Sequence, residues 1–155
     1  MSISTSTLIA APPRIVAEVL CDFDSYPNWN PQAPELRADK TAPDGRPLVG
    51  AILRGKMRLS SSKIVQVRAV ISHCDHEQLK WGAGIPYIFN GTHTFSYLTQ
   101  AEDANMTHFV NTEVFGGIFG SVFGYFFGQS LHDQFSAMNT KLKERAEQHY
   151  REVKS

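Results

Sequence analysis

Two side chains able to exchange protons, His93 and Glu113, stand in mostly apolar stretches of the sequence. Both stretches have the residue pattern of β-strands, and turn-forming residues at 102–105 predict that they form a hairpin. If both side chains lie on one face, an imidazole and a carboxylate in an apolar pocket could move a proton on a bound ligand. A register shift of one residue would send Glu113 to the other face and separate the pair. The alternative is structural: His93 hydrogen-bonds a neighbour, and Glu113 pairs with a surface Lys or Arg.

The other reactive residue types indicate no metal, cofactor or nucleophile site. Four further histidines lack the spacing of metal ligands: His73, His76, His108 and His149. His132 and Asp133 are adjacent in a predicted helix and point to different faces, so they are expected to be surface residues. Cys21 and Cys74 form no CxxC motif, which favours two buried free thiols over a zinc site or a redox pair. Because GxSxG, P-loop and GxGxxG motifs are also missing, we expect no cofactor and no metal.

Composition excludes several classes of partner. The chain has 155 residues with 15 Lys+Arg and 15 Asp+Glu, so its formal net charge is zero. Without a basic face it is not expected to bind nucleic acid. The length predicts a single domain over residues 1–155, and a hydrophobic content of 42% excludes disorder. The first residues have no basic region and only a short apolar run, so we expect a cytoplasmic protein.

The uncharged stretch 114–132 raises the question of a membrane span. Its ladder of Gly120, Gly124 and Gly128 is typical of close helix packing in membranes, but Ser, Gln and His dilute the stretch. Its apolar residues recur at helical intervals, so we expect a buried amphipathic helix and no transmembrane segment. The glycines would clear one side of this helix for a strand, a ligand or another subunit.

The chain order predicts an α+β fold. A strand at 4–10 is followed by a short helix at 13–21, which begins at a proline, and by one possible helical turn at 25–28. From 35 to 112 the sequence reads as a series of antiparallel strands, with Asn90-Gly91 interpreted as a bulge or bend inside one of them. After 116–117 the apolar period changes from two to about 3.6, which predicts one long C-terminal helix of about thirty residues.

A curved sheet closing over a helix rich in Phe predicts an internal apolar cavity. Leu131, Phe135, Met138 and Leu142 are expected to be core residues of the helix. The helix holds more Phe than one face can show to the sheet, so the others line the cavity, cover its mouth or form a dimer patch. The predicted ligand-binding residues are Trp29, Leu53, Met57, Trp81, Phe89, Phe95, Phe109, Phe115, Phe119, Phe123, Phe126 and Phe127.

Segments spread over nearly the whole chain resemble one superfamily. They are 11–31, with the sequence APPRIVAEVLCDFDSYPNWNP, then 79–82, 89–95, 107–109, 113–117 and 135–143. In this order they resemble the START-like, helix-grip superfamily, in its SRPBCC and polyketide cyclase/dehydrase branch. The resemblance implies a seven-stranded antiparallel sheet, two short helices after the first strand, and a long C-terminal helix gripped around a cavity. The branch usually has Trp where this chain has Ala17. The smaller alanine would enlarge the cavity or leave a space that a neighbouring Phe fills.

Three functions remain open at this point, because a fold does not transfer a function. The first is an enzyme that binds an aromatic or polyketide-like molecule and catalyses a cofactor-free cyclisation, dehydration or isomerisation with His93 and Glu113. The second is a carrier that only binds a hydrophobic ligand. The third is an interaction or membrane-peripheral module that uses the segment 114–132. The chain is expected to be a monomer or a homodimer.

Overall fold

Seven strands and three helices follow one another in the order that the sequence predicts. The computed structural model describes residues 1–155. The elements are β1 (Ser2–Ile9), α1 (Pro13–Cys21), the 3-10 helix η1 (Phe23–Asn28), β2 (Glu35–Ala38), β3 (Ile52–Ser60), β4 (Lys63–Cys74), β5 (Gln78–Ile85), β6 (Phe89–Gln100), β7 (Asp103–Gly116) and α2 (Gly120–Lys154).

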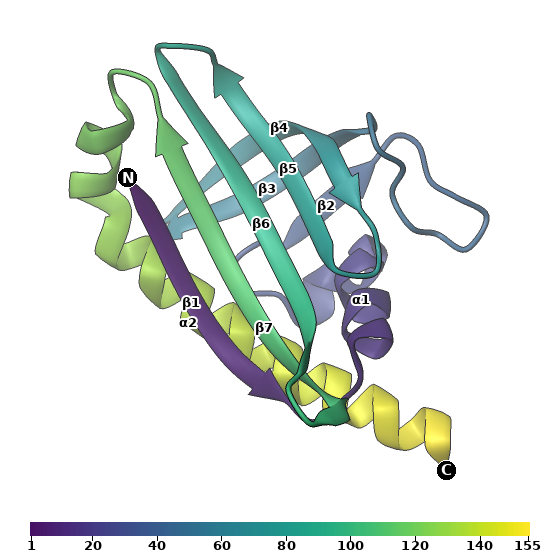
Figure 1. The fold of residues 1–155 in the computed structure, drawn as a ribbon. Helices are drawn as coiled ribbons and strands as arrows, with labels where there is room; N and C mark the ends of the chain where they lie inside the picture. Colours follow the sequence, from purple (N-terminus) through teal and green to yellow (C-terminus); the bar gives the residue numbers. More distant parts are fainter.

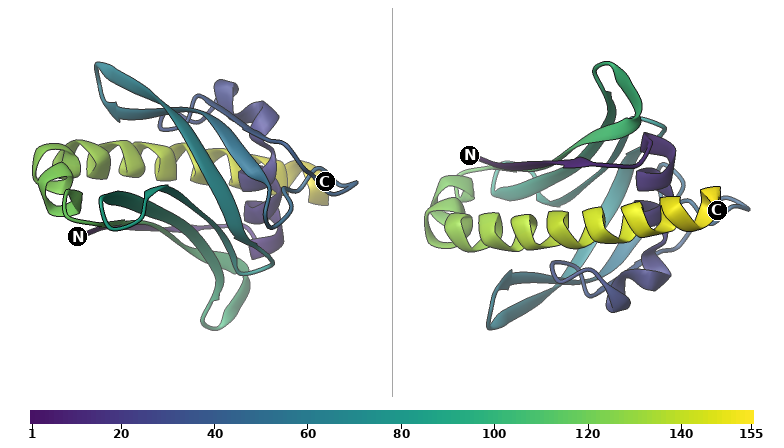
Figure 2. Two further views of the ribbon diagram at one scale, coloured as in Figure 1. Left: turned by 90° about the horizontal axis from the view of Figure 1, so that it is seen from above. Right: turned by 90° about the horizontal axis from the view of Figure 1, so that it is seen from below.

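All seven strands form one antiparallel sheet in the order β1-β7-β6-β5-β4-β3-β2. From β2 to β7 each strand pairs with the next in the chain, and β1 joins the sheet by pairing with β7. The sheet curves, and α2 lies across its concave side with strands on two sides of the helix (Figure 1, Figure 2). The helix-grip α+β fold predicted from the sequence is therefore confirmed.

Local signals set most of the element boundaries. Pro13 occupies the first turn of α1, where its missing N–H costs no hydrogen bond, and the helix buries four aliphatic residues on one side.

The interpretation of Asn90-Gly91 as a bulge or bend was wrong: both residues pair in unbroken register with β5 and with β7. The chain reverses instead at 86–88, immediately before β6.

The hydrophobic interior has two parts of unequal size. A main core of 23 buried residues joins α1, η1 and the sheet to Met138, Leu142 and Ala146 in the second half of α2. A minor core of four residues lies along the first half of α2 and consists of Ile3, Phe115, Leu131 and Phe135. On the concave side of the sheet, the main core therefore lies against the second half of α2 and the minor core against the first half.

The glycine ladder of α2 acts sterically, as the sequence suggested. A Cβ on Gly124 would overlap the side chain of Met1, and one on Gly120 would lie 3.1 Å from the backbone of Phe115. The first turns of the helix therefore lie close to Met1 and to the end of β7, where a larger residue would require its neighbours to shift. No helix in the structure combines the length and the apolar character that a membrane crossing requires.

Candidate functional site

The hairpin of β6 and β7 places His93 and Glu113 directly opposite each other. Their Cα atoms are register partners, so both side chains stand on the same face of the sheet. His93 Nδ1 lies 2.7 Å from Glu113 Oε2, and the side chains are 1% and 14% exposed. The oxygen lies off the direction of an Nδ1–H bond, so the contact is a close pair rather than a straight hydrogen bond. The rings of Trp81, Phe95 and Phe135, at 4.5–5.1 Å from the imidazole, hold it in place.

A chain of buried polar groups sets which nitrogen of His93 carries a hydrogen. Asn111 donates from Nδ2 to Met138 Sδ, at 3.4 Å, and to Asn139 Oδ1, at 3.2 Å. Asn139 in turn donates to Thr5 Oγ1, at 2.9 Å. A thioether sulfur can only accept, so the amide nitrogen of Asn111 faces Met138 and its oxygen faces His93. His93 Nε2 must therefore donate the 2.7 Å hydrogen bond to Asn111 Oδ1.

This arrangement turns the Nδ1 side of the imidazole toward Glu113. With Nε2 donating to Asn111, Nδ1 is the ring nitrogen left to exchange a proton, and it lies 2.7 Å from Glu113 Oε2. An imidazole and a carboxylate placed side by side can accept and donate protons.

Gly91 makes room for the Glu113 carboxylate. The glycine lies two residues before His93 on β6, on the same face of the sheet. A Cβ built at this position would lie 2.5 Å from Glu113 Oε1, so any larger residue there would force the carboxylate to move. The glycine that the sequence suggested as a bend is thus the space into which the carboxylate extends.

The pair opens onto a pocket of about 330 Å³ between the sheet and the first half of α2. Strands β3 to β7 form one wall, and the minor core side chains of α2 form the other. Twelve of the nineteen lining residues are hydrophobic. Five of the residues predicted to bind a ligand line this pocket together with His93 and Glu113: Met57, Trp81, Phe89, Phe115 and Phe123.

Seven predicted ligand-binding residues lie outside this lining. Leu53, Phe95 and Phe109 are fully enclosed in the main core, because their strand positions face the packed part of the sheet. Trp29 stacks edge-on against Tyr26 beside η1. Phe127 packs on the minor core. The remaining two face solvent: Phe119, immediately before α2, is 53% exposed, and Phe126, in α2, is 70% exposed.

Gln32 is a polar group of the pocket that could not be predicted from the sequence. Its side chain lines the pocket, the residue is 1% exposed, and neither its amide nitrogen nor its amide oxygen has a hydrogen-bonding partner in the protein. Leaving such a group unpaired costs about 1–3 kcal/mol. Gln32 follows Pro31 in a loop of turn formers, which predicted a turn but held no sign that a side chain there enters the pocket.

Several other lining residues were also missed. Leu131 and Phe135 were expected to be core residues, and they are buried and line the pocket as well. Apart from Met57, the wall from β3 and β4 was not anticipated, because small and aliphatic residues on a strand look alike whether they face a core or a pocket. These residues are Leu59, Val65, Val67 and Ala69. Ala17 lies outside the lining and faces a separate polar hollow beside α1.

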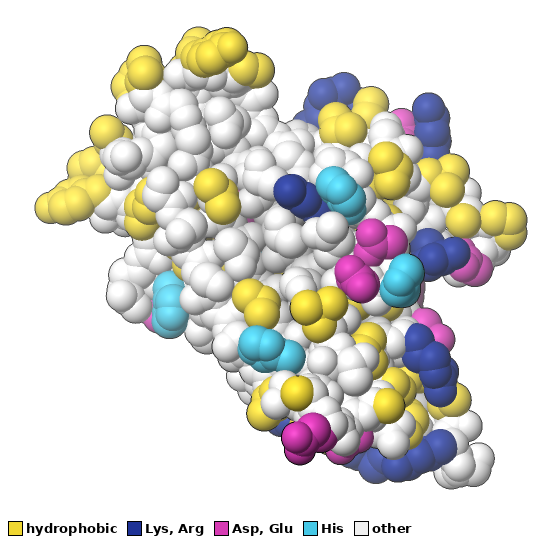
Figure 3. Space-filling view, in the orientation of Figure 1, with side chains coloured by type: hydrophobic (Ala, Val, Ile, Leu, Met, Phe, Trp, Pro, Cys, Tyr) yellow, Lys and Arg dark blue, Asp and Glu magenta, His cyan; other side chains and the backbone are white.

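Exposed hydrophobic side chains form an apolar tip at the end of the molecule where α2 begins (Figure 3). We define the tip as Ile85, Tyr87, Ile88, Ile118, Phe119, Val122, Tyr125 and Phe126. Two backbone hydrogen bonds join its two segments, from the N–H of Ile118 to the carbonyl of Tyr87 and from the N–H of Phe119 to the carbonyl of Ile88, both 3.0 Å long.

No cluster of three or more His, Cys, Asp or Glu side chains suited to a metal ion is present anywhere in the structure.

Comparison with solved structures supports the fold. The chain is similar to the Zhui aromatase/cyclase from Streptomyces sp. R1128, with a TM-score of 0.72 and 16% identity over 95% of this chain and 93% of that one. It is also similar to the protein TTHA0849 from Thermus thermophilus, with a TM-score of 0.71 and 15% identity over 94% and 97% of the two chains. A START superfamily protein from Mycobacterium smegmatis has a TM-score of 0.68 and 16% identity over 92% and 97%.

No curated protein matches the chain. The family model described as "Polyketide cyclase / dehydrase and lipid transport" matches residues 1–147, which is nearly the whole sequence. Together with the helix-grip sheet and its pocket, this match shows that the chain belongs to the polyketide cyclase/dehydrase and lipid transport family.

Proposed function

We propose that the protein binds an aromatic or polyketide-like molecule in this pocket and catalyses a cofactor-free cyclisation, dehydration or isomerisation on it. One observation carries the proposal: His93 Nδ1 and Glu113 Oε2 lie 2.7 Å apart at the wall of an apolar pocket. A volume of about 330 Å³ is at the lower end of the range for small-molecule sites, about 300–1,000 Å³, and suits a compact ligand of a few rings.

Proton transfer at Glu113 accounts for all three reactions. Its carboxylate can take a proton from a carbon next to a ligand carbonyl, and the His93 imidazole beside it holds the carboxylate in place. The acid formed can return the proton to another atom of the ligand, which is an isomerisation. If it protonates a departing hydroxyl, water leaves and the ligand is dehydrated. If the carbanion first attacks a second carbonyl, a ring forms and the proton goes to the new alkoxide.

Gln32 supports a ligand that also carries a polar group. Its buried amide can donate one hydrogen bond and accept another, so a carbonyl or hydroxyl oxygen placed beside it would satisfy a group that the protein leaves unpaired. Apolar walls with a few fixed polar groups are typical of sites that orient a ligand as well as enclose it.

Deuterium exchange into 2-tetralone tests both binding and proton transfer. This bicyclic ketone contains one aromatic ring and has acidic protons next to its carbonyl, and their exchange in D₂O can be followed by NMR. The protein is expected to accelerate the exchange. Glu113→Gln should lower the acceleration about 100-fold or more, because an amide cannot take the proton, while 2-tetralone still binds.

Surface substitutions of the same type provide the control. Glu144→Gln removes an exposed carboxylate of α2 that pairs with Lys141 at 3.1 Å, and it should leave both binding and exchange unchanged. Phe123→Ala, in the pocket wall, should weaken binding. If Glu113→Gln and His93→Gln leave exchange unaltered while Phe123→Ala still abolishes binding, the enzyme proposal fails and the carrier function stands.

Native mass spectrometry of protein purified from its own host would identify the ligand itself. The expected result is a co-purified aromatic molecule of a few rings that is lost from the Phe123→Ala variant. A long-chain lipid in its place would contradict the proposed ligand class and favour the carrier function.

A further inference from the structure

The fold brings the two cysteines of the chain together at the end of the molecule that carries α1. Cys21 is the last residue of α1 and Cys74 the last residue of β4, 53 positions apart, yet their sulfur atoms are 3.9 Å from each other. Both are free thiols.

No redox pair was expected from the sequence, because the sequence lacks a CxxC motif and does not show which residues meet across the sheet. The expectation that both thiols are buried holds only for Cys21, since Cys74 is half-buried.

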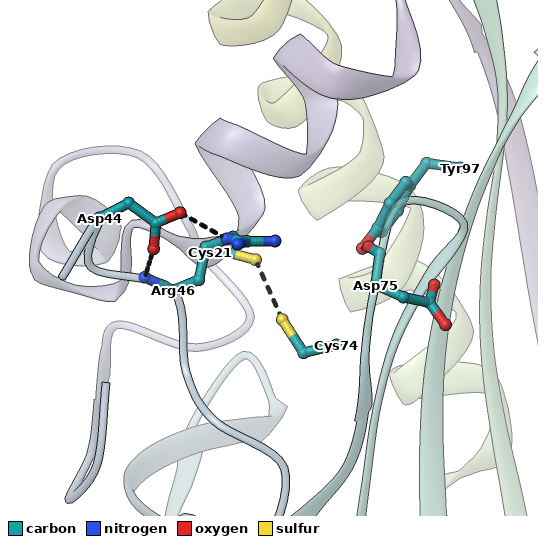
Figure 4. A network of polar contacts seen from close by, with 6 residues as sticks. All are labelled: Cys21, Asp44, Arg46, Cys74, Asp75 and Tyr97. Carbon is teal, nitrogen blue, oxygen red and sulfur yellow. Dashed lines mark hydrogen bonds and ion pairs between the residues drawn. The ribbon is translucent and has the colours of Figure 1, made fainter. Parts of the chain in front are cut away.

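A polar hollow reaches this pair of cysteines at Cys21, while the half-buried Cys74 lies outside its lining. The hollow lies between α1, the loop from β2 to β3, and the turn from β4 to β5, and its lining includes Cys21 together with Arg46 and Asp75. Ala17, one helical turn before Cys21, leaves the hollow open where a larger side chain would narrow it. Figure 4 shows the two sulfurs facing each other, with Asp44 and Arg46 on one side and Asp75 and Tyr97 on the other.

The two thiols have different surroundings. The hydrogen bond from Cys21 lowers the pKa of the Cys74 thiol, and the nearby Arg46 guanidinium lowers it further against the opposing effects of burial and Asp75. The same hydrogen bond, together with burial, raises the pKa of Cys21. Cys74 is also the more accessible of the two. Thiolates rather than thiols are nucleophiles, so Cys74 is suited to attack and Cys21 to follow.

We propose that Cys21 and Cys74 form a reversible redox site that reacts with peroxides or with small disulfides, Cys74 attacking first and Cys21 closing the disulfide. The present separation of 3.9 Å must fall to the bonded distance of about 2.0 Å. Both residues end an element, so this closure needs side-chain rotation and a small shift of two chain ends rather than a rearrangement of the sheet.

The reaction with a peroxide balances in two steps. The Cys74 thiolate attacks one oxygen of hydrogen peroxide, the O–O bond breaks, hydroxide leaves, and a sulfenic acid forms on Cys74. The sulfur of Cys21 then attacks the sulfur of Cys74, the S–O bond breaks, and the thiol proton leaves with the hydroxyl group as water. Two thiols are oxidised to one disulfide while peroxide is reduced to water. With oxidised glutathione, two thiol–disulfide exchanges give the same product and two reduced glutathione molecules.

This site is separate from the ligand pocket, because the two linings share no residue. A disulfide here would tie the end of α1 to the end of β4 and close a long loop of the chain. Closing such a loop restricts the unfolded chain and stabilises the folded one. Oxidation is therefore expected to make the protein harder to unfold and to leave 2-tetralone exchange at the pocket unchanged.

Titration of the reduced protein with hydrogen peroxide, and separately with oxidised glutathione, tests the proposal. The chain has only two cysteines, so intact mass spectrometry after alkylation reports the state of both. The expected product is a monomer that has lost two hydrogen atoms, takes up no alkylating reagent, melts roughly 5 °C or more higher, and recovers both thiols with dithiothreitol.

Single substitutions assign the order of attack. Cys21→Ala should accumulate a lasting glutathione adduct on Cys74, because no second thiol can displace it. Cys74→Ala should react with glutathione disulfide at least about tenfold more slowly than the wild type, because Cys21 is buried. Two free thiols after oxidation, or a disulfide between two chains on a non-reducing gel, would overturn the proposal. Faster reaction at Cys21 than at Cys74 would overturn the assigned order.

Discussion

The two halves of α2 differ in what they pack against. The second half buries Met138, Leu142 and Ala146 in the main core, where α1, η1 and the sheet surround them. The first half has three glycines against the β1 and β7 edge and only a minor core beneath it, and it exposes Tyr125 and Phe126 to solvent. In Figure 1 these are the yellow and green parts of a single helix.

The pocket occupies the place where the first half of α2 leaves the sheet incompletely filled. Side chains of β3 to β7 reach the main core at one end of the sheet and the pocket at the other. We call the end of the sheet that carries the main core the closed end, and the end that carries the pocket the open end. The closed end can hold the fold together, while the open end keeps an empty volume and unpaired polar groups. Stability and ligand binding would then be separable by mutation along one helix, which the following substitutions test in order of decreasing effect on the free energy of unfolding.

Truncating one leucine in each half should give the largest effect and the clearest contrast. Leu142→Ala opens a void in a region that is packed on all sides and should lower the free energy of unfolding by about 4 kcal/mol. Leu131→Ala only enlarges an existing pocket, so about 2 kcal/mol is expected. Urea unfolding measures both values. Equal losses would show that the first half of α2 is packed as tightly as the second.

Breaking the buried polar chain should have the next largest effect. Asn111→Leu leaves the Nε2–H of His93 and the Oδ1 of Asn139 without partners, which should cost about 1–3 kcal/mol. It also frees His93 to carry its hydrogen on Nδ1, so 2-tetralone exchange should fall even at temperatures where the variant is folded. Asn105→Ala, at an exposed asparagine, is the control. Unchanged exchange in folded Asn111→Leu would refute the role of Asn111 in fixing the imidazole.

Gln32 should give an effect of opposite sign. Gln32→Met replaces a buried amide that has no partners with an apolar side chain of similar length, so the free energy of unfolding should rise by about 1 kcal/mol. The same change should weaken binding of 2-tetralone, whose carbonyl would lose its donor. A calorimetric titration beside urea unfolding measures both. A variant that is less stable and binds as tightly would show that Gln32 is a structural residue.

The sequence predicted the elements well because their signals are local. Pro13 predicts the start of α1, and the change of apolar period after 116–117 predicts the start of α2. The pairing of His93 with Glu113 could be predicted only as one of two alternatives, because it depends on the register between β6 and β7. The two-residue turn at 101–102 does not set this register alone. The register shifts between Thr99 and Gln100, and this irregularity brings His93 opposite Glu113.

Features that depend on tertiary contacts could not be predicted in the same way. The aromatic residues of 115–127 occur on every side of α2, so periodicity could not separate Phe123, which lines the pocket, from Phe126, which faces solvent. The contact of Cys21 with Cys74 depends on where two distant elements end. No local pattern marks such a contact.

Gly91 should separate function from stability within the open end itself. In Gly91→Ala the new Cβ would lie 2.5 Å from Glu113 Oε1, so the carboxylate must move. Displacement of a reacting group by about 1 Å can lower a rate about 100-fold, while the free energy of unfolding should change by about 0.5 kcal/mol or less. The matched control is Gly82→Ala on β5, where a Cβ meets no atom closer than 3.7 Å. Equal exchange rates in the two variants would show that the position of Glu113 is not critical.

A substitution in the apolar tip should have the smallest effect on the free energy of unfolding, and it tests whether the tip joins two copies of the chain. Phe126 is 70% exposed, so Phe126→Ser should change the free energy of unfolding by less than about 0.5 kcal/mol. Light scattering coupled to size exclusion tests whether the tip joins two copies. A dimer of the wild type that becomes monomeric in Phe126→Ser would place the contact at the tip, because the substitution acts on little else. A wild type that is monomeric at high concentration would show that the open end holds a pocket and no self-association surface.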